Sequence, residues 1–193
     1  HTMKFGALVA NEDVGFTRVE KEIVSLIGPN GAGKTTLFNC ITGFYAPFSG
    51  QVMYTGTDGN THDITGMASD KICNMGITRT FQIVKTLNEM TVEQNVMTGA
   101  FLHTNRTKDA QREALRVLEQ TGLMEKKDML GRNLTIVDRK RVEIARALAT
   151  KPRILMLDEC MAGLNQTEVK DVMKLIIDLR DQGLTLLIVE HIM

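Results

Sequence analysis

The chain has 193 residues, of which 43% are hydrophobic and 24% charged, values typical of a single globular domain with a substantial core. Lysine plus arginine and aspartate plus glutamate both number 23, so the net charge is zero and the basic excess of nucleic-acid-binding proteins is absent. No apolar run is long enough to span a bilayer and the N-terminus lacks a secretory signal pattern, so we expect any membrane role to be peripheral.

The first part of the chain alternates short apolar stretches with turns. Strands are predicted at Met3–Ala10, Val14–Val19 and Glu22–Ile27. The third strand runs directly into the glycine-rich segment Gly28–Thr35, and a helix is predicted next, over Thr36–Thr42. A strand, a glycine-rich turn and a helix in this order are the local arrangement that a phosphate-binding loop requires.

The middle of the chain changes from short elements to long helices. A strand is predicted at Gln51–Tyr54, and residues 55–67, rich in Gly, Thr, Asp and Asn, are predicted to form a loop. A short helix at Ser69–Met75 and a strand at Gly76–Phe81 follow. From about Thr91 to Ala149 the apolar spacing is mostly that of helices.

The last part of the chain returns to strands. An apolar strand is predicted at Ile154–Leu157, and a helix follows it. Asn165 and Glu168 are spaced as a capping box at the start of that helix. A final strand is predicted at Leu184–Val189.

This order of elements predicts an α/β fold, a P-loop nucleotide-binding core with an antiparallel β subdomain and an inserted all-helical subdomain. The core is expected to comprise residues 1–82 and 151–193, and the helical subdomain about residues 83–150.

The glycine-rich segment matches the phosphate-binding loop Gly-x-x-x-x-Gly-Lys-Thr at every fixed position. Its glycines let consecutive backbone N–H groups turn toward phosphates, and the following helix directs its positive end at them. Lys34 is predicted to reach the β- and γ-phosphates of ATP, and the Thr35 hydroxyl to bind Mg²⁺. The candidate nucleotide-binding residues here are Gly28, Pro29, Asn30, Gly31, Ala32, Gly33, Lys34, Thr35 and Thr36.

Two acidic residues directly follow the apolar strand Ile154–Leu157. Asp158 is predicted to bind the magnesium, directly or through water. Glu159 is predicted to polarise the water that attacks the γ-phosphate. Downstream of a complete phosphate-binding loop, this pair indicates nucleotide hydrolysis.

These two motifs, the run Glu143–Ala149 and the segment Ala162–Asn165 together resemble the ABC-transporter ATPases, and the resemblance covers essentially the whole chain. It implies that Gln82 senses magnesium and the attacking water, so Gln82 is both a catalytic and a metal-site candidate. It implies that His191 contacts the γ-phosphate and that Phe5 stacks on adenine. It also places Asn165 in a loop that contacts the opposite subunit.

Shorter phrases are similar to the ATPases of branched-chain amino-acid importers. The most diagnostic is the phrase Thr78–Gln82, and others lie at Phe5–Ala10, Ile41–Tyr45 and Met90–Val96. This likeness implies import of branched-chain or related amino acids. It does not identify a solute, because the binding protein and the permease select the solute.

The chain departs from the family pattern at two motifs. Where the family has Leu-Ser-Gly-Gly-Gln, this sequence reads Leu134-Thr135-Ile136-Val137-Asp138, and Cys160 replaces a usual proline. Thr135 is expected to cap the following helix, but the β-branched Ile136 and Val137 are expected to keep a phosphate farther from the backbone. Asp138 is expected to add a negative charge near the partner's triphosphate, partly offset by the three cations that follow it, Arg139, Lys140 and Arg141. A weaker ATP-driven dimer and slow basal hydrolysis follow from this expectation.

The resemblance also implies partners and a location. We expect a homodimer or a heterodimer with a related ATPase subunit, which contacts transmembrane permease subunits and, through them, a periplasmic binding protein. No nucleic-acid partner is expected. The location implied is the cytoplasmic face of the bacterial inner membrane, and three scattered cysteines fit reduced thiols there. The domain is expected to be truncated at its C-terminus, because such domains usually continue beyond the histidine that contacts the γ-phosphate, here His191.

Three alternatives stay open to different degrees. A soluble ABC ATPase of the repair or translation-factor kind is disfavoured, because the chain has neither paired cassettes nor a long coiled-coil insert. A GTPase-like switch is disfavoured by the lack of an Asn-Lys-x-Asp motif. A nucleotide-binding module with little turnover is left open by the altered segment Leu134–Asp138.

Overall fold

The computed structural model describes residues 3–5, 8–11, 22–29, 31–56, 58–81 and 86–190, with the backbone alone for 3–5 and 8–11. Within these ranges, four parallel strands form the central sheet in the order β3-β8-β7-β6. These strands are β3 (Ile23–Ile27), β6 (Ile77–Arg79), β7 (Ile154–Asp158) and β8 (Thr185–Glu190). Because all four run in one direction, their carboxyl ends meet at one edge of the sheet, where α/β folds bind ligands.

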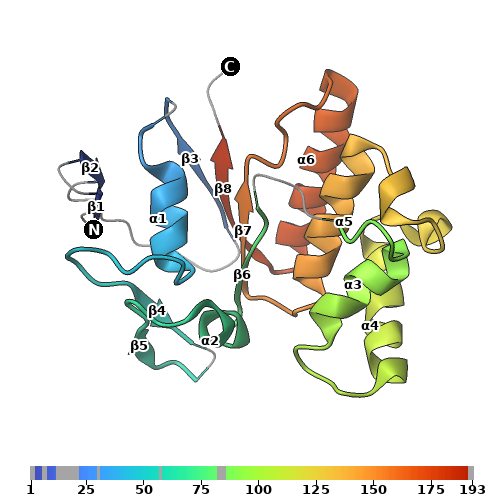
Figure 1. Ribbon diagram of the computed structural model, residues 1–193, viewed down its shortest axis with the longest axis horizontal. Helices are drawn as coiled ribbons and strands as arrows, with labels where there is room; N and C mark the ends of the chain where they lie inside the picture. Colours follow the sequence, from blue (N-terminus) through green and yellow to red (C-terminus); the bar gives the residue numbers. More distant parts are fainter. Residues whose placement is uncertain are drawn as a thin grey trace.

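The two faces of the sheet carry separate cores because alternate residues of a strand point to opposite sides. Leu155 and Leu157 of β7 pack with the helices on one face, whereas Met156 packs on the other. In Figure 1, α3 to α6 lie on one side of the sheet and α1, α2 and the β4–β5 pair on the other. Buried on both faces, β7 and β8 are almost uniformly apolar.

The side of the sheet that holds the glycine-rich loop combines helices with short antiparallel strands. Here Phe38, Ile64 and Ile72 form part of the second core. The elements are α1 (Lys34–Ile41), α2 (Ser69–Asn74), β4 (Met53–Thr55), β5 (Thr61–Asp63), β1 (Met3–Phe5) and β2 (Leu8–Asn11). The pairs β1–β2 and β4–β5 are both antiparallel.

Two details of the predicted elements are wrong. The predicted loop 55–67 contains the strand β5. Its polar residues Thr61–Asp63 form an antiparallel pair with β4. The single strand predicted at Met3–Ala10 is two strands, β1 and β2, which pair with each other. Backbone pairing, which composition does not reveal, decides both cases. The strand predicted at Val14–Val19 lies outside the described residues.

The helical side of the molecule lies between β6 and β7 in sequence and continues after β7. α3 contacts α4 and α5, and α4 also contacts α5. Its elements are α3 (Val92–Ala100), α4 (Thr107–Gln120), the short 3₁₀ helices η1 (Met124–Lys126) and η2 (Gly131–Asn133), α5 (Ile136–Leu148) and α6 (Gln166–Asp181). The predicted capping box of α6 is confirmed, since Asn165 and Glu168 bind each other's backbone N–H groups. No described helix combines the length and the apolar character needed to cross a bilayer.

Gly99 sets the distance between α3 and α5. A Cβ atom at this position would lie 2.1 Å from the Arg146 carbonyl oxygen of α5. We expect Gly99→Ala to lower the free energy of unfolding by about 2 kcal/mol, because overpacking outweighs the gain of about 1 kcal/mol in helix propensity. Urea denaturation measures this change. Thr98→Ala, on the exposed side of α3, is the matched control and should change the free energy of unfolding by less than about 0.5 kcal/mol. A Gly99→Ala protein as stable as the unaltered chain would show that α3 and α5 can move apart without cost.

Candidate active site

The glycine-rich loop connects β3 to α1 at the carboxyl edge of the sheet. Gly31 and Gly33 have φ of 80° and 76°, a region that other residues rarely adopt, and Gly33 is the N-cap of α1. Lys34 folds back over the loop, and its Nζ donates to the carbonyl oxygens of Gly28 at 2.6 Å and Pro29 at 2.9 Å. The first backbone N–H groups of α1 have no partner within the helix, so this end of α1 suits an anion.

The acidic pair lies at the carboxyl end of β7, next to β8 and two strands from β3. Asp158 is fully buried as a side chain, and its backbone N–H donates to the Thr80 hydroxyl at 3.3 Å. Glu159 is also buried and has φ of 49°; among the described residues, Lys151 is the other non-glycine residue with positive φ. The Glu159 N–H donates to the Val189 carbonyl oxygen at 2.9 Å. A left-handed conformation costs about 1–3 kcal/mol and often marks a functional site.

Arg79, the last residue of β6, links Asp158 to α1, the helix that follows the phosphate-binding loop. Its Nη2 donates to Asp158 Oδ2 at 2.9 Å, and its Nη1 donates to Asn39 Oδ1 of α1 at 2.6 Å. Burial lowers the pKa of the Arg79 guanidinium from its ordinary value, and attraction to Asp158 opposes that shift. The arginine stays charged, so Asp158 has a permanent counterion.

Two buried charges of α5 hold the strand ends from the helical side. Lys140 Nζ donates to the Glu159 carbonyl oxygen at 3.0 Å, and Glu143 Oε1 accepts the Phe81 backbone N–H at 3.0 Å. Burial raises the pKa of Glu143, although the Phe81 N–H opposes the shift. Both side chains line a small pocket with Asp158 and Cys160. The helix α5 is therefore fixed to the residues just before Gln82 and to Glu159.

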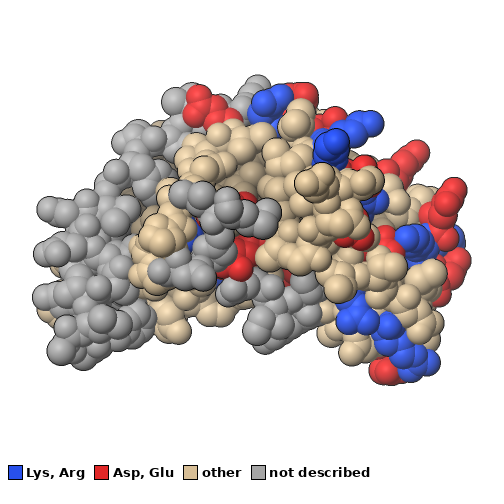
Figure 2. Space-filling view, turned by 90° about the horizontal axis from the view of Figure 1, so that it is seen from above, with Lys and Arg blue, Asp and Glu red and all other residues tan. Residues whose placement is uncertain are grey.

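A third carboxylate lies beside this pair at the end of β8. Glu190 Oε1 accepts hydrogen bonds from the Met161 N–H at 3.1 Å and from the Cys160 thiol at 3.6 Å. Burial raises the pKa of Glu190, and the nearby Glu159 adds to the shift. Burial also raises the pKa of the Cys160 thiol well above its ordinary value, so this cysteine stays protonated. Figure 2 shows acidic side chains gathered at the middle of the face where the parallel strands end.

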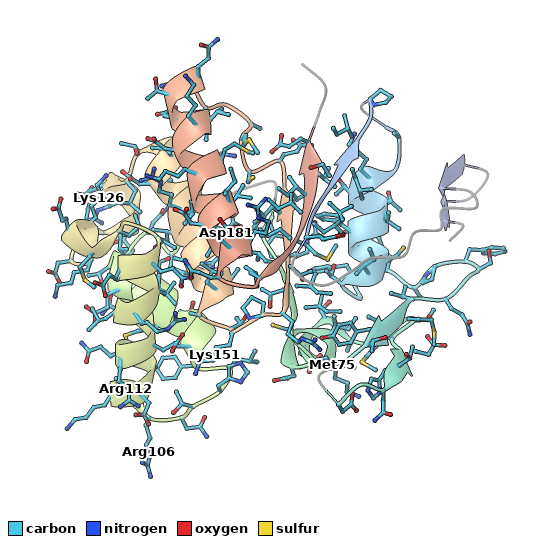
Figure 3. All side chains as sticks on the ribbon, turned by 180° about the vertical axis from the view of Figure 1, so that it is seen from behind. Met75, Arg106, Arg112, Lys126, Lys151 and Asp181 are labelled. Carbon is cyan, nitrogen blue, oxygen red and sulfur yellow. The ribbon has the colours of Figure 1, made fainter. Side chains whose placement is uncertain are left out.

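The segment Leu134–Asp138 forms the start of α5. As predicted, Thr135 is the N-cap and its Oγ1 accepts the Asp138 N–H at 3.2 Å. Asp138 is buried, and its Oδ2 accepts from Lys126 Nζ at 2.6 Å and from the Thr135 hydroxyl at 2.7 Å. Burial opposes ionisation of Asp138, but these hydrogen bonds outweigh it and lower its pKa. Figure 3 shows Lys126 at the outer end of the helical side.

The charge of Asp138 is therefore compensated mainly by Lys126, which is not among the three cations expected to offset it. Of those three, Arg139 donates to the backbone oxygens of Leu134 and Arg132. Lys140 donates to the Glu159 carbonyl oxygen, as described above. Arg141 forms an ion pair with Asp171 and exerts only a weaker attraction on Asp138.

Several predicted site residues are not tested by this geometry. Asn30, Gln82 and His191 lie outside the described residues, and Phe5 is described by its backbone alone. The structure brings Asp158 and Glu159 together at the end of β7 and links Asp158 to α1 through Arg79.

A sequence model of the ABC transporter family matches residues 11–162, about four fifths of the chain. The chain belongs to the ABC transporter family. The prediction of an ABC ATPase is therefore confirmed, and so is the predicted fold class, because the structural relatives are ABC cassettes.

Relatives of this ABC protein include a curated transporter subunit and two solved cassettes. The high-affinity branched-chain amino acid transport ATP-binding protein LivG of Salmonella typhimurium is 44% identical over 98% of this chain and 78% of its own length. The ADP conformation of MJ1267, an ATP-binding cassette of an ABC transporter, has a TM-score of 0.87 at 31% identity, over 100% of this chain and 79% of that one. A dimeric post-hydrolysis state of the cassette MJ0796, bound to ADP and Pi, has a TM-score of 0.80 at 27% identity, over 99% of this chain and 84% of that one.

Sequence reasoning missed the roles of Arg79, Lys140 and Glu143 in this ABC cassette. The signal for Arg79 is a cation in a strand that is buried on both faces, because a buried charge requires a partner. Lys140 and Glu143 are three residues apart on α5, a spacing that places them on one face of the helix. The sequence does not show which strand ends that face meets.

Proposed function

We propose that this chain is the ATP-binding and ATP-hydrolysing subunit of an importer for branched-chain or related amino acids. The observation that carries the proposal is the edge of the sheet where the parallel strands end. The phosphate-binding loop follows β3 at this edge, and the pair Asp158–Glu159 lies at the end of β7, with β8 between these two strands. The identity to LivG supports the solute class.

The residues of the loop and of the end of β7 fit a nucleoside triphosphate with Mg²⁺. The fit rests on the donors present, because the Thr35 hydroxyl and the Asp158 carboxylate are hard oxygen ligands of the kind Mg²⁺ prefers. Arg79 donates to Asp158 Oδ2 and places a positive charge beside this carboxyl group. We assign the nucleotide to Gly28–Thr36 with Phe5 as a candidate adenine contact, and Mg²⁺ to Thr35, Gln82 and Asp158. When bound, Mg²⁺ supplies neutralisation of phosphate charge.

The chain's own groups account for the hydrolytic step. Glu159 accepts a proton from the attacking water, and hydrogen bonds to its backbone N–H and carbonyl oxygen hold the residue at the end of β7. Lys34 is assigned to the β- and γ-phosphates, where it stabilises charge that develops during transfer. Gln82 and His191 complete the proposed site by positioning the water and the γ-phosphate. Catalysis in this proposal is positioning and charge stabilisation, without a covalent intermediate.

The active form is proposed to be a homodimer or a heterodimer with a related ATPase subunit, as in the dimeric MJ0796. Each site would take the segment Leu134–Asp138 from the opposite chain. Ile136 supports a surface role, since it is 63% exposed at the start of α5 although it is apolar. Lys126 binds Asp138, and Val137 is partly buried against the helical core. The β-branched, exposed Ile136 is therefore the main remaining steric reason to expect a weak dimer contact.

We propose a core (1–82 and 151–193) and a helical subdomain (about 83–150). By likeness to importers, the helical subdomain is proposed to contact the transmembrane permease in a groove beside the Gln82 loop. Exposed apolar side chains lie close to this position along the chain, namely Phe81, Leu87 and Met90, and the exposed Phe44 contacts the Phe81 ring edge to face. The fully buried Asn95 holds the segment Leu87–Thr91, because its Oδ1 accepts the Leu87 N–H and its Nδ2 donates to the carbonyl oxygens of Leu87, Met90 and Thr91. Contact with the permease would keep the chain at the cytoplasmic face of the inner membrane, and a periplasmic binding protein would lie on the other side of that membrane.

Site-specific cross-linking tests this docking. A cysteine at Glu89 or Met90, within Thr86–Glu93, should capture the permease, whereas a cysteine at Lys174, exposed on α6, should not. Cys73 is first replaced by serine, since it is partly exposed, while Cys40 and Cys160 are buried. Capture from Lys174 and not from the Thr86–Glu93 loop would place the permease on the opposite surface.

The function itself is tested by phosphate release and by uptake. The purified chain should release phosphate from Mg·ATP, and the chain reconstituted with its permease should drive uptake of labelled leucine. Phosphate release without uptake of any branched-chain amino acid would contradict the proposed solute class, but the assignment of ATPase activity would still hold. Binding of ATP without phosphate release, alone or with the permease, would indicate a nucleotide-binding module instead, as Ile136 and Val137 allow.

A further inference from the structure

Arg79 lies in this site but has no role in the hydrolytic step proposed above. Its side chain is 6% exposed and that of Asp158 is 0% exposed, so their ion pair is shielded from water. The same guanidinium donates to Asn39 Oδ1 of α1 at 2.6 Å and to Oγ1 of Thr42, the C-cap of α1, at 3.4 Å. The planar arginine fork therefore fixes Asp158 relative to the helix that follows the phosphate-binding loop.

Three phenylalanine rings enclose the guanidinium. Its central carbon lies 5.0 Å from the ring centre of Phe81, 5.6 Å from that of Phe44 and 5.8 Å from that of Phe38. Phe38 is fully buried, whereas Phe44 is 50% exposed and Phe81 39% exposed. The two exposed rings contact each other edge to face at 5.6 Å. A contact made on them from outside thus reaches Arg79 directly.

We propose that Arg79 is a positioning residue for the metal-binding carboxylate Asp158, and that Phe44 and Phe81 transmit contacts at the apolar surface to it. The proposal rests on the proposed function, because it takes Asp158 as a ligand of Mg²⁺. Carboxylates that bind a metal are oriented by hydrogen bonds from an outer partner, and here that partner is Arg79. A permease helix that moves the two rings would change the orientation of Asp158 and so the metal affinity of the loaded site.

The affinity for Mn²⁺ separates positioning from a merely structural role. Mn²⁺ prefers the same oxygen ligands as Mg²⁺, and its binding to the ADP-loaded chain is measured by electron paramagnetic resonance. Arg79→Lys keeps the charge but loses the fork, so we expect Mn²⁺ to bind about 10–100-fold more weakly. ADP affinity without metal should stay unchanged. Wild-type Mn²⁺ affinity in a folded Arg79→Lys protein overturns the proposal.

A second variant covers the case in which Arg79→Lys does not fold. Asn39→Ala removes one anchor of the guanidinium and leaves the ion pair with Asp158 in place. It should weaken Mn²⁺ binding about threefold or more, since one hydrogen bond to a charged group is lost. Unchanged Mn²⁺ affinity in Asn39→Ala then overturns the positioning role.

The role of the surface rings is tested by a double-mutant cycle. Phe44→Leu keeps an apolar side chain but removes the ring above the guanidinium, and should weaken Mn²⁺ binding about 2–5-fold. Phe101→Leu, at a phenylalanine of similar exposure that is the C-cap of α3, is the matched control and should have no effect. Added to Arg79→Lys, Phe44→Leu should cause no further loss, because both act through one group. Independent, multiplying effects overturn the transmission from the surface. If the unaltered chain binds no ADP, the proposed function fails, and that result is distinct from each of these.

Discussion

Lys34→Ala is expected to lower the affinity of the chain for Mg·ATP by about 10²-fold or more, because hydrogen bonds to a charged group contribute about 1.5–3 kcal/mol. The Lys34 ammonium already lies over the phosphate-binding loop, where it binds the carbonyl oxygens of Gly28 and Pro29. Bound phosphates would replace these carbonyl groups with fully charged oxygens. Isothermal titration calorimetry measures the change.

The control for this variant is Lys174→Ala, which removes an exposed lysine on α6 far along the chain from the loop. It should bind Mg·ATP as the unaltered chain does. Thermal unfolding of the Lys34→Ala protein verifies that the loop variant is folded, since the two carbonyl contacts are lost with the side chain. Equal affinity in the folded Lys34→Ala protein would show that the phosphates bind elsewhere.

Glu159→Gln is expected to bind Mg·ATP normally and to hydrolyse it roughly 10²–10⁴-fold more slowly, the usual contribution of a general base. The amide has the shape of the carboxylate, and the contacts that hold the residue involve its backbone, which the substitution leaves intact. Single-turnover phosphate release measures the hydrolytic step, and calorimetry measures binding.

Glu119→Gln, at an exposed position on α4, is the matched control and should leave hydrolysis unchanged. A Glu159→Gln protein that releases phosphate at the rate of the unaltered chain would remove Glu159 from the mechanism. Slower hydrolysis together with weaker nucleotide binding would instead indicate a disturbed phosphate site.

The local features of this protein follow from short stretches of sequence. The phosphate-binding loop is contiguous in sequence, and its backbone conformation requires its glycines. The segment Gly28–Thr35 can therefore be recognised from the sequence alone. The capping box of α6 joins residues three positions apart, and the strand ending in Asp158 and Glu159 is marked by its apolar run. The family pattern of these motifs also led to the ABC transporter family, which the family model confirms.

The weakly patterned elements needed the fold. The stretch Thr61–Asp63 reads as a loop because it is polar, but it becomes a strand by pairing with β4. The sequence predicts that Asp138 adds its negative charge near the partner's triphosphate, but in the fold Lys126 of η1 lies 2.6 Å from its carboxylate. Polar composition alone does not reveal such pairing partners.

What the sequence by itself determined is the nucleotide chemistry, because each motif is a short run whose local geometry depends on its own residues. Only the tertiary structure decided how those motifs are joined. Arg79 meets Asp158 across 79 residues of chain, and Glu143 meets the Phe81 backbone across 62. Burial makes a counterion or hydrogen-bond partner obligatory for each of these charges, but which partner it is depends on which strand ends and helix faces pack together.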